Sequence, residues 1–501
     1  MAHFHADTII LGDGTAGAVV AGILAAKSDE SILVLEAGPD YGALADGRWP
    51  ADLVDARVIP FSHDWGYDSG ATYPDRVVKF ERARVIGGCS SHNGCAAIWG
   101  ARADYDAWAA AGNDGWSTDA LLPLFVAANR RLRVRVFEPD EMTPFQQACL
   151  DAAPGVGVPV VRDLNDVDDE DGMGPNPVNI ADGRRWNTAF AYLDPVRGKP
   201  NLRVRGNVLV DRLEIDGGRV VAVHVVGAAG PERIEGSRFV LTGGTYGSPA
   251  VLLRSGVGPA DELGKLGIRS ALDLPGVGRN LHDHPMVTVV HTGSPALVHR
   301  MREFAAARWA PEEQTIAKMR SPACREAFDL HLFPVGGPYA PSPTGWYWLF
   351  QVACMTPRSR GWLKLASAEP QAAPSIDHRY LTDEEEHDAD RLADGIELAR
   401  AFAVQPSLRD EIGVEFLPGA KLQSSAALAD YARRAGIHYY HPVGTCRMGP
   451  SSDPGAVADA RGRIHGLDNA WIADAALIPV IPRANTNIPV VVVAERVAGW
   501  L

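Results

Sequence analysis

The first 36 residues hold the feature that most restricts how this chain can fold. Residues 7–11 are a short apolar run, followed by the glycine loop GDGTAG at residues 12–17 and an alanine-rich segment that ends near Ala26. A second apolar run, residues 32–35, ends in Glu36, 19 residues after Gly17. This order predicts a strand, a tight turn, a helix and a parallel second strand, which is an α/β fold. It also predicts a dinucleotide site, because the loop N–H groups and the helix N-terminus can approach a pyrophosphate while the acid accepts from a ribose hydroxyl.

A second glycine loop, ARVIGGCSSHN at residues 83–93, is expected to lie against the same ligand. Two adjacent glycines followed by small polar residues allow the backbone to pass close to a flat or charged group. His92 and Asn93 then bring two nitrogen-bearing side chains to that group. A third loop, GGTYGSP at residues 243–249, follows the apolar run 239–242 and repeats the strand-then-glycine pattern.

Composition excludes several classes of protein. The 48 basic against 62 acidic residues give a net charge of −14, which argues against a nucleic-acid surface. No apolar run reaches membrane-spanning length, and residues 1–6 have the pattern of neither a signal peptide nor a basic arm. The six cysteines are scattered without CxxC pairs, so we expect a reduced cytoplasmic protein without structural zinc or disulfides.

The rest of the chain contains two kinds of sequence pattern, one with glycine loops between short strands and one without them. Residues 202–215 and 220–226 alternate as the strands of a hairpin, whereas the acidic residues 140–171 are expected to be an irregular surface excursion. Residues 293–423 lack glycine loops, and strand-like runs at 327–333 and 346–354 predict an antiparallel sheet with an amphipathic helix at 383–404. The C-terminal stretch resembles the N-terminal region again, with a strand at 470–474 and a final helix that Asn485 or Asn487 would cap.

Four motifs, taken in order, give the chain a resemblance to a known family. They are the loop 12–17 with Glu36, the loop 83–93, the segment 244–258, and the C-terminal pair His-Pro-Val-Gly-Thr and Asn-Thr-Asn. Together they resemble the glucose–methanol–choline (GMC) oxidoreductases, the FAD-dependent alcohol oxidases and dehydrogenases. The resemblance implies a Rossmann-like FAD-binding domain (residues 1–158, 192–290 and 430–501) and an inserted α+β substrate domain built on an antiparallel sheet (residues 159–191 and 291–429).

The resemblance also assigns residues to the cofactor. The expected FAD contacts are Gly12, Gly14, Thr15, Ala16, Gly17, Glu36, Ala37, Arg84, Gly87, Gly88, Ser91, His92, Asn93, Gly94, Val208, Asp474, Ala475, Asn485 and Thr486. The GGCSSHN sequence is closest to choline oxidases, whose matching histidine is bound covalently to the flavin 8α-methyl group. His92 is therefore expected to be this anchor; the alternative is a packed polar residue beside the flavin.

Oxidation of an alcohol needs a group that takes the hydroxyl proton while hydride leaves the carbon, and a neutral imidazole suits that task. His441 matches the catalytic histidine of the family, and Asn485 matches its partner. Because asparagine does not titrate, Asn485 would orient the substrate oxygen and His441 would be the base. His438, Tyr439 and Tyr440 are expected to line the substrate pocket, with a structural role left open for His438.

Two further groups of residues have less certain roles. His282 and His284 flank Asp283, but family members carry a similar motif without metal, so hydrogen bonding is expected there and no metal site. Glu303 is the candidate counterpart of the carboxylate that faces quaternary ammonium in choline oxidases, and exposed charge is the favoured interpretation. The chain also has Gly94 where those enzymes carry serine.

The function implied is oxidation of a primary alcohol to the aldehyde, with hydride passing to flavin N5 and O2 yielding H2O2. The alternative is a dehydrogenase that passes electrons to a quinone or protein carrier. A light-driven or lyase-type member is disfavoured because His441 and Asn485 are both present. The expected partners are a small alcohol and O2 or another acceptor, with a homodimer as a candidate assembly.

Overall fold

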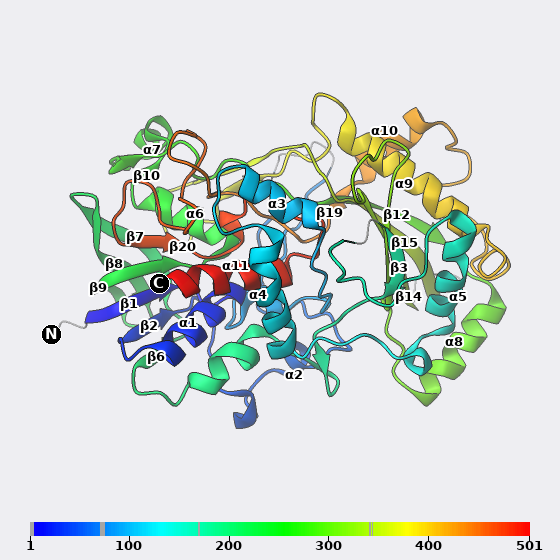
Figure 1. Ribbon diagram of the computed structural model, residues 1–501, viewed down its shortest axis with the longest axis horizontal. Helices are drawn as coiled ribbons and strands as arrows, with labels where there is room; N and C mark the ends of the chain where they lie inside the picture. Colours follow the sequence, from blue (N-terminus) through cyan, green and yellow to red (C-terminus); the bar gives the residue numbers. More distant parts are fainter. Residues whose placement is uncertain (1–4, 71–75, 169–170, 340–341, 343) are drawn as a thin grey trace.

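A seven-stranded sheet built around the N-terminal strand forms one half of the molecule (Figure 1). The computed structural model describes residues 5–70, 76–168, 171–339, 342 and 344–501. The parallel strands are β6 (Leu202–Arg205), β2 (Ile32–Leu35), β1 (His5–Leu11), β9 (Gly230–Leu241) and β20 (Ala470–Ile472); β8 (Arg219–Gly227) and β7 (Leu209–Asp216) continue the sheet antiparallel beyond β9. The predicted βαβ unit and its parallel register, Ile9 opposite Leu33, are confirmed.

Helices α1 (Thr15–Lys27) and α11 (Asn487–Trp500) lie side by side beside this sheet, next to α4 (Thr118–Arg131) (Figure 1). Glycines allow α1 to approach its neighbours closely. A Cβ at Gly17 would collide with the Gly12 carbonyl oxygen, and one at Gly22 with the Tyr192 carbonyl oxygen. The last glycine of the loop is thus required for packing the helix onto the first strand.

An antiparallel sheet forms the other half. Its strands run in the order β18 (Glu415–Leu417), β12 (Pro285–His291), β15 (Trp346–Cys354), β14 (Leu330–Pro338), β13 (Thr315–Met319) and β3 (Gly172–Pro175), and β19 (Ile437–His438) also pairs with β12. Helix α9 (His387–Ala403) packs on β15, β12 and β14, with α10 (Ser425–Ala435) against α9. In Figure 1 these helices lie above the sheet, and α5 (Pro144–Ala152) and α8 (Pro295–Ala307) lie on its outer right-hand side. The sheet expected in the substrate part is confirmed.

Shorter elements complete the fold. They are the helices α2 (Ala51–Val54), α3 (Arg102–Ala110), α6 (Gly244–Arg254) and α7 (Ala260–Lys265), and the strand pairs β4 (Ile180–Ala181) with β5 (Arg184–Arg185), β10 (Val257–Gly258) with β11 (Leu272–Asp273), and β16 (Trp362–Lys364) with β17 (Ser375–Asp377). Helix α6 begins in the third glycine loop, as the pattern at residues 243–249 predicts.

Three expectations need correction. Residues 202–215 are two strands, because Asn207 takes a left-handed conformation between β6 and β7 and the chain changes partner there. Residues 140–171, of which 169–170 lie outside the described part, are not an irregular excursion, since α5 buries Phe145 and Cys149. Neither asparagine caps the last helix, where Thr486 is the N-cap and makes no side-chain bond.

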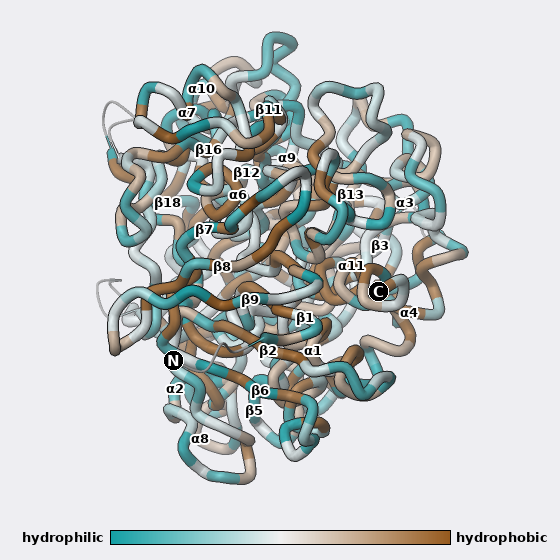
Figure 2. The backbone as a smooth tube through the Cα atoms, turned by 90° about the vertical axis from the view of Figure 1, so that its left-hand side faces the viewer, coloured by the Kyte–Doolittle hydropathy of each residue, from teal (hydrophilic) through white to brown (hydrophobic). Residues whose placement is uncertain are grey.

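The domain division remains a proposal. The boundary expected between residues 290 and 291 falls inside β12, and β19 belongs to the antiparallel sheet although it lies within residues 430–501. In Figure 2 the hydrophobic colouring follows the interior strands, while many outer loops are hydrophilic. Among the described helices, none is both long and apolar enough to cross a membrane. Residues 1–4 of the N-terminal segment considered above lie outside the described part.

Candidate active site

A cavity of about 530 Å³ is lined by residues from both sheets and the loops between them. Leu11 and Leu35, at the carboxyl ends of β1 and β2, represent the parallel sheet, and Phe333 and Gln351 represent the antiparallel sheet. Loops at the carboxyl ends of parallel strands are where ligands bind in such folds. The cavity therefore lies where the glycine-loop pattern places a dinucleotide.

The first two glycine loops meet at one end of this cavity. The Gly87 N–H donates to the Asp13 carbonyl at 2.7 Å, and the Ser90 N–H donates to Thr15 Oγ1 at 3.1 Å. Gly88 has φ of +51°, and a Cβ there would lie 2.6 Å from Gly14 Cα. Only glycine allows this approach, so the two loops form a single cradle at the N-terminus of α1.

Glu36 lines the cavity and also holds the first loop. Its Oε2 accepts from the Asp13 N–H at 2.8 Å and its Oε1 from the Gly38 N–H at 2.7 Å. The pKa of Glu36 is raised, because the effect of burial exceeds the opposing effect of these two N–H groups. The Asp13 carboxyl is fully buried, does not line the cavity and has no hydrogen-bond partner in the described structure. Burial and the nearby Glu36 raise its pKa well above the usual range, which favours the neutral acid.

Most of the expected cofactor residues line this one cavity. They are Gly12, Gly14, Thr15, Ala16, Glu36, Ala37, Gly88, His92, Asn93, Gly94, Asp474, Ala475, Asn485 and Thr486. Gly17, Arg84, Gly87, Ser91 and Val208 are not among the lining residues. Arg84 is exposed and its guanidinium lies over Trp65, and the Val208 N–H donates to the Glu36 carbonyl, with Leu209 and Val210 lining the cavity instead.

His92 faces the cavity with one ring nitrogen already engaged. Its Nε2 lies 3.0 Å from the Ser62 carbonyl oxygen, which can only accept, so Nε2 carries the proton. Nδ1 is then the unprotonated nitrogen. Burial lowers the pKa of His92, which keeps the ring neutral. A neutral ring with a free Nδ1 is chemically suited to act as a nucleophile.

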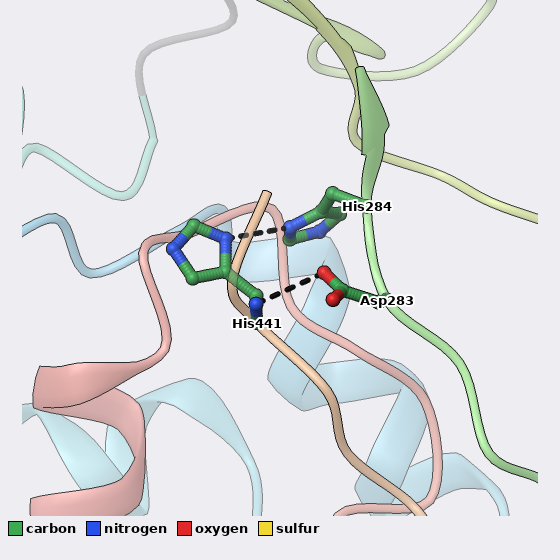
Figure 3. A group of neighbouring side chains, drawn as sticks. All are labelled: Asp283, His284 and His441. Atoms are coloured by element: carbon green, nitrogen blue, oxygen red, sulfur yellow. Dashed lines mark hydrogen bonds between the residues drawn. The ribbon is translucent and has the colours of Figure 1, made fainter. Parts of the chain in front are cut away.

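His441 is buried in the cavity wall, and Figure 3 shows its contacts with His284 and Asp283. Its Nε2 lies 3.3 Å from Asn485 Nδ2, and its Nδ1 lies 3.1 Å from His284 Nδ1. Its backbone N–H donates to Asp283 Oδ1 at 2.9 Å. Burial, together with His284 and Arg82, lowers the pKa of His441 well below its usual range. The imidazole is therefore neutral and can accept a proton.

Two polar atoms beside His441 are buried without a partner in the described structure. They are Asn485 Oδ1 and the Tyr439 hydroxyl, and both residues line the cavity. Buried polar atoms of this kind usually bind water or a ligand. Tyr440 also lines the cavity, with its side chain half-exposed at φ of +66°. His438 does not line it; the ring packs against Tyr440, and burial lowers its pKa to about 3.

Sequence reasoning missed Glu313, Gln351 and Asn487, which also line the cavity. Glu313 Oε2 would lie 3.6 Å from a Cβ added at Gly94. Burial and the neighbouring Glu312 raise the pKa of Glu313 to about 8. Its position two residues before β13 carries no local signal of function. Glu303, considered from the sequence, is instead exposed on α8 beside His299.

Asp283, His284 and His441 offer ligand atoms within 4.8 Å of one another, the geometry of a possible metal group. The two rings contact each other through Nδ1, and the Asp283 carboxyl accepts from the backbone N–H of His441 and from the Tyr380 hydroxyl at 3.1 Å. Burial raises the pKa of Asp283 to about 7. The hydrogen-bonding role expected for His284 and Asp283 matches these contacts.

Comparison with known proteins identifies relatives along nearly the whole chain. The sequence profiles of GMC oxidoreductases match residues 6–286 and 357–494. The chain is 32% identical to mitochondrial choline dehydrogenase of Mus musculus, covering 98% of this chain and 88% of that protein. It is 31% identical to 5-(hydroxymethyl)furfural oxidase of Methylovorus sp., covering 98% of each. The structure of pyridoxine 4-oxidase from Mesorbium loti superposes with a TM-score of 0.87 and 29% identity over 99% of both chains.

Proposed function

The chain belongs to the GMC oxidoreductase family of flavin-dependent enzymes acting on CH–OH donors, and from this we propose that it oxidises a primary alcohol to the aldehyde, with O2 reduced to H2O2. The observation that carries the proposal is His441 Nε2 beside the unpartnered Asn485 Oδ1 in the wall of the cavity. The proposed location is the cytoplasm, where the six free cysteines would stay reduced. A homodimer remains the candidate assembly.

The cradle fits FAD. Backbone at Gly14 and Gly88 and the N-terminus of α1 would hold the pyrophosphate, and Glu36 would accept from a ribose hydroxyl while holding the loop. The N-terminus of α11, with Thr486 and Asn487 in the cavity wall, offers N–H groups to developing negative charge. FAD, when bound, supplies the two-electron acceptor for the hydride that leaves the carbinol carbon.

The chain's own part in the reaction is to position the alcohol and take its proton. The substrate hydroxyl would donate to His441 Nε2, and the Asn485 Nδ2 amide and the Tyr439 hydroxyl would donate to its oxygen. As the carbon loses hydride, the O–H bond breaks, its proton moves to Nε2 and the C–O bond becomes a carbonyl. Because His441 is neutral in the resting site, it is ready to accept this proton at neutral pH.

The electron acceptor is the point on which the relatives differ. Two of those named above are called oxidases and one a dehydrogenase. The choline-oxidase-like loop that contains His92 favours O2, and transfer to a quinone or protein carrier is the second candidate. Oxygen uptake and H2O2 formation, measured with and without an artificial acceptor across a panel of primary alcohols, separate the two.

The carboxylate of Glu313 favours an alcohol with a positively charged group. It lines the cavity from the segment just before β13, and no arginine or lysine forms an ion pair with it in the described part of the chain. A cation there would gain a charge-assisted contact and lower the pKa of Glu313 from its raised value.

The proposed role of His441 is tested by anaerobic rapid mixing. His441→Ala should reduce the rate of flavin reduction by about 10²–10⁴, the usual contribution of a general base. His438→Ala is the matched control, because His438 is a buried histidine three residues away that does not line the cavity. Full-rate reduction in His441→Ala would show that the base lies elsewhere.

A further inference from the structure

We propose that His284 is a positioning residue that keeps the proton of His441 on Nδ1, so that Nε2 is free to accept the substrate proton. The inference rests on the proposed function of His441 and adds the group that sets its tautomer. His284 lies 157 positions away in the sequence, directly before β12, and nothing in the spacing connects it to His441. Figure 3 shows the two rings facing each other with Asp283 below them.

The contact between the two rings requires one shared proton. The Nδ1 atoms lie 3.1 Å apart, the ring planes cross at 86°, and both residues are buried. Burial lowers the pKa of His441 well below its usual range and that of His284 to about 3, so both rings are neutral. Two lone pairs or two N–H groups at this distance would repel each other. One ring must therefore donate and the other accept.

The contact on the far side of the His441 ring indicates which ring donates. Asn485 Nδ2 lies 3.3 Å from His441 Nε2, and an amide nitrogen can only donate, so Nε2 is the acceptor. The neutral ring of His441 then carries its proton on Nδ1, which faces His284 Nδ1. His284 Nδ1 is therefore the acceptor, and the proton of His284 lies on Nε2, a buried atom without a hydrogen-bond partner in the described structure. The opposite arrangement would direct the His441 Nε2–H at the amide N–H.

The charged groups near His441 do not fix the position of the proton on its ring. Asp283 binds the backbone N–H of His441 and not its ring. The other ionisable groups that act on the His441 pKa are Arg82, His331 and His438. In the described part of the chain none of these three forms a hydrogen bond with the His441 ring, whereas His284 does. Among the described ionisable groups, the imidazole of His284 is thus the one that can hold the Nδ1 proton of His441 by direct contact, opposite the Asn485 amide at Nε2.

The direct test is ¹⁵N NMR of histidine-labelled, FAD-loaded enzyme, with His441 signals assigned by their loss in His441→Ala. The wild type should show a protonated Nδ1 and an unprotonated Nε2 at His441. A protonated Nε2 in the wild type would overturn the proposal without any variant of His284. The NMR spectrum reports the tautomer of His441 and tests only the role of His284. The rate of flavin reduction tests the proposed function, which full-rate reduction in His441→Ala would refute.

Variants of His284 test the causal link. His284→Leu should shift the His441 tautomer toward Nε2–H and slow flavin reduction by about 10–100-fold, the scale known for groups that orient metal-binding histidines. His284→Asn places an amide oxygen near the position of Nδ1 and should restore both the tautomer and most of the rate. His284→Gln, which is similar in volume but extends past that position, should not. Equal losses in the Asn and Gln variants with an unchanged His441 tautomer would show that His284 only fills space.

Discussion

At the residue scale, we propose that Glu313 selects for alcohols that carry a positive charge. Burial and Glu312 raise its pKa to about 8, so the carboxylate forms as the pH rises through that value. The KM for a cationic alcohol such as choline should therefore fall as the pH rises toward and past 8. The KM for the neutral isostere 3,3-dimethylbutan-1-ol should stay nearly constant. Steady-state kinetics from pH 6 to about pH 9.5 with both substrates measure this difference.

Glu313→Gln provides the control for that profile. The amide keeps the shape of the side chain but loses the charge, so the KM for the cationic alcohol should rise about 10-fold or more and lose its pH dependence. The neutral isostere should be affected little. If both alcohols respond equally to pH and to the substitution, Glu313 does not bind the cation.

His92 is the second residue with a distinct chemical expectation. Its unprotonated Nδ1 and its place in the cavity wall fit a covalent flavin anchor. Acid-precipitated enzyme should then stay yellow, and its intact mass should exceed that of the chain by one FAD. His92→Ala should fold and bind FAD through the cradle but release it on denaturation. A colourless precipitate from fully loaded enzyme would leave His92 as a packed polar residue.

At the element scale, we expect the contact between the two glycine loops to control cofactor binding. Gly88→Ala introduces a Cβ 2.6 Å from Gly14 Cα at a residue with φ of +51°, so the loops must separate. We expect FAD loading to fall at least about 10-fold, which corresponds to about 1.4 kcal/mol. Absorbance of the purified enzyme at the flavin band, relative to protein, measures the loading.

Gly264→Ala in α7 is the matched substitution, because a Cβ there has no heavy atom within 4 Å. It should leave FAD loading unchanged and add up to about 1 kcal/mol of stability through helix propensity. Equal loading in the two variants would mean that the loops tolerate separation and do not form one cradle.

At the scale of the whole molecule, the cavity connects the two sheets. Its lining extends from Leu11 in β1 to Val490 in α11 and includes Gln351 in the antiparallel sheet, so bound FAD should stabilise both halves together. In His92→Ala stripped of flavin, the Tm should rise with added FAD, corresponding to about 2.7 kcal/mol at 100 times Kd. Scanning calorimetry over an FAD titration checks this. Two separate transitions, of which only one moves with FAD, would contradict a shared site.

The sequence by itself determined the parts that depend on neighbouring residues. The strand, glycine loop, helix and acid of residues 7–36 follow from local periodicity and turn chemistry, and the expected βαβ unit is present. The same holds for the strand pair β14 and β15 and for the helix α9. His441 and Asn485 also follow from short motifs, and the structure brings their side chains within 3.3 Å although their catalytic roles stay predictions.

Only the tertiary structure decided which distant residues share the cavity. The split of β6 from β7, the burial of α5 and the entry of Glu313 into the cavity depend on how the two sheets pack. His284 and His441 are 157 residues apart, and their contact exists because β12 begins where the C-terminal loop crosses it. Local sequence encodes turns and amphipathic faces, whereas contacts of this kind are fixed by the free energy of packing the whole chain, which no short segment contains.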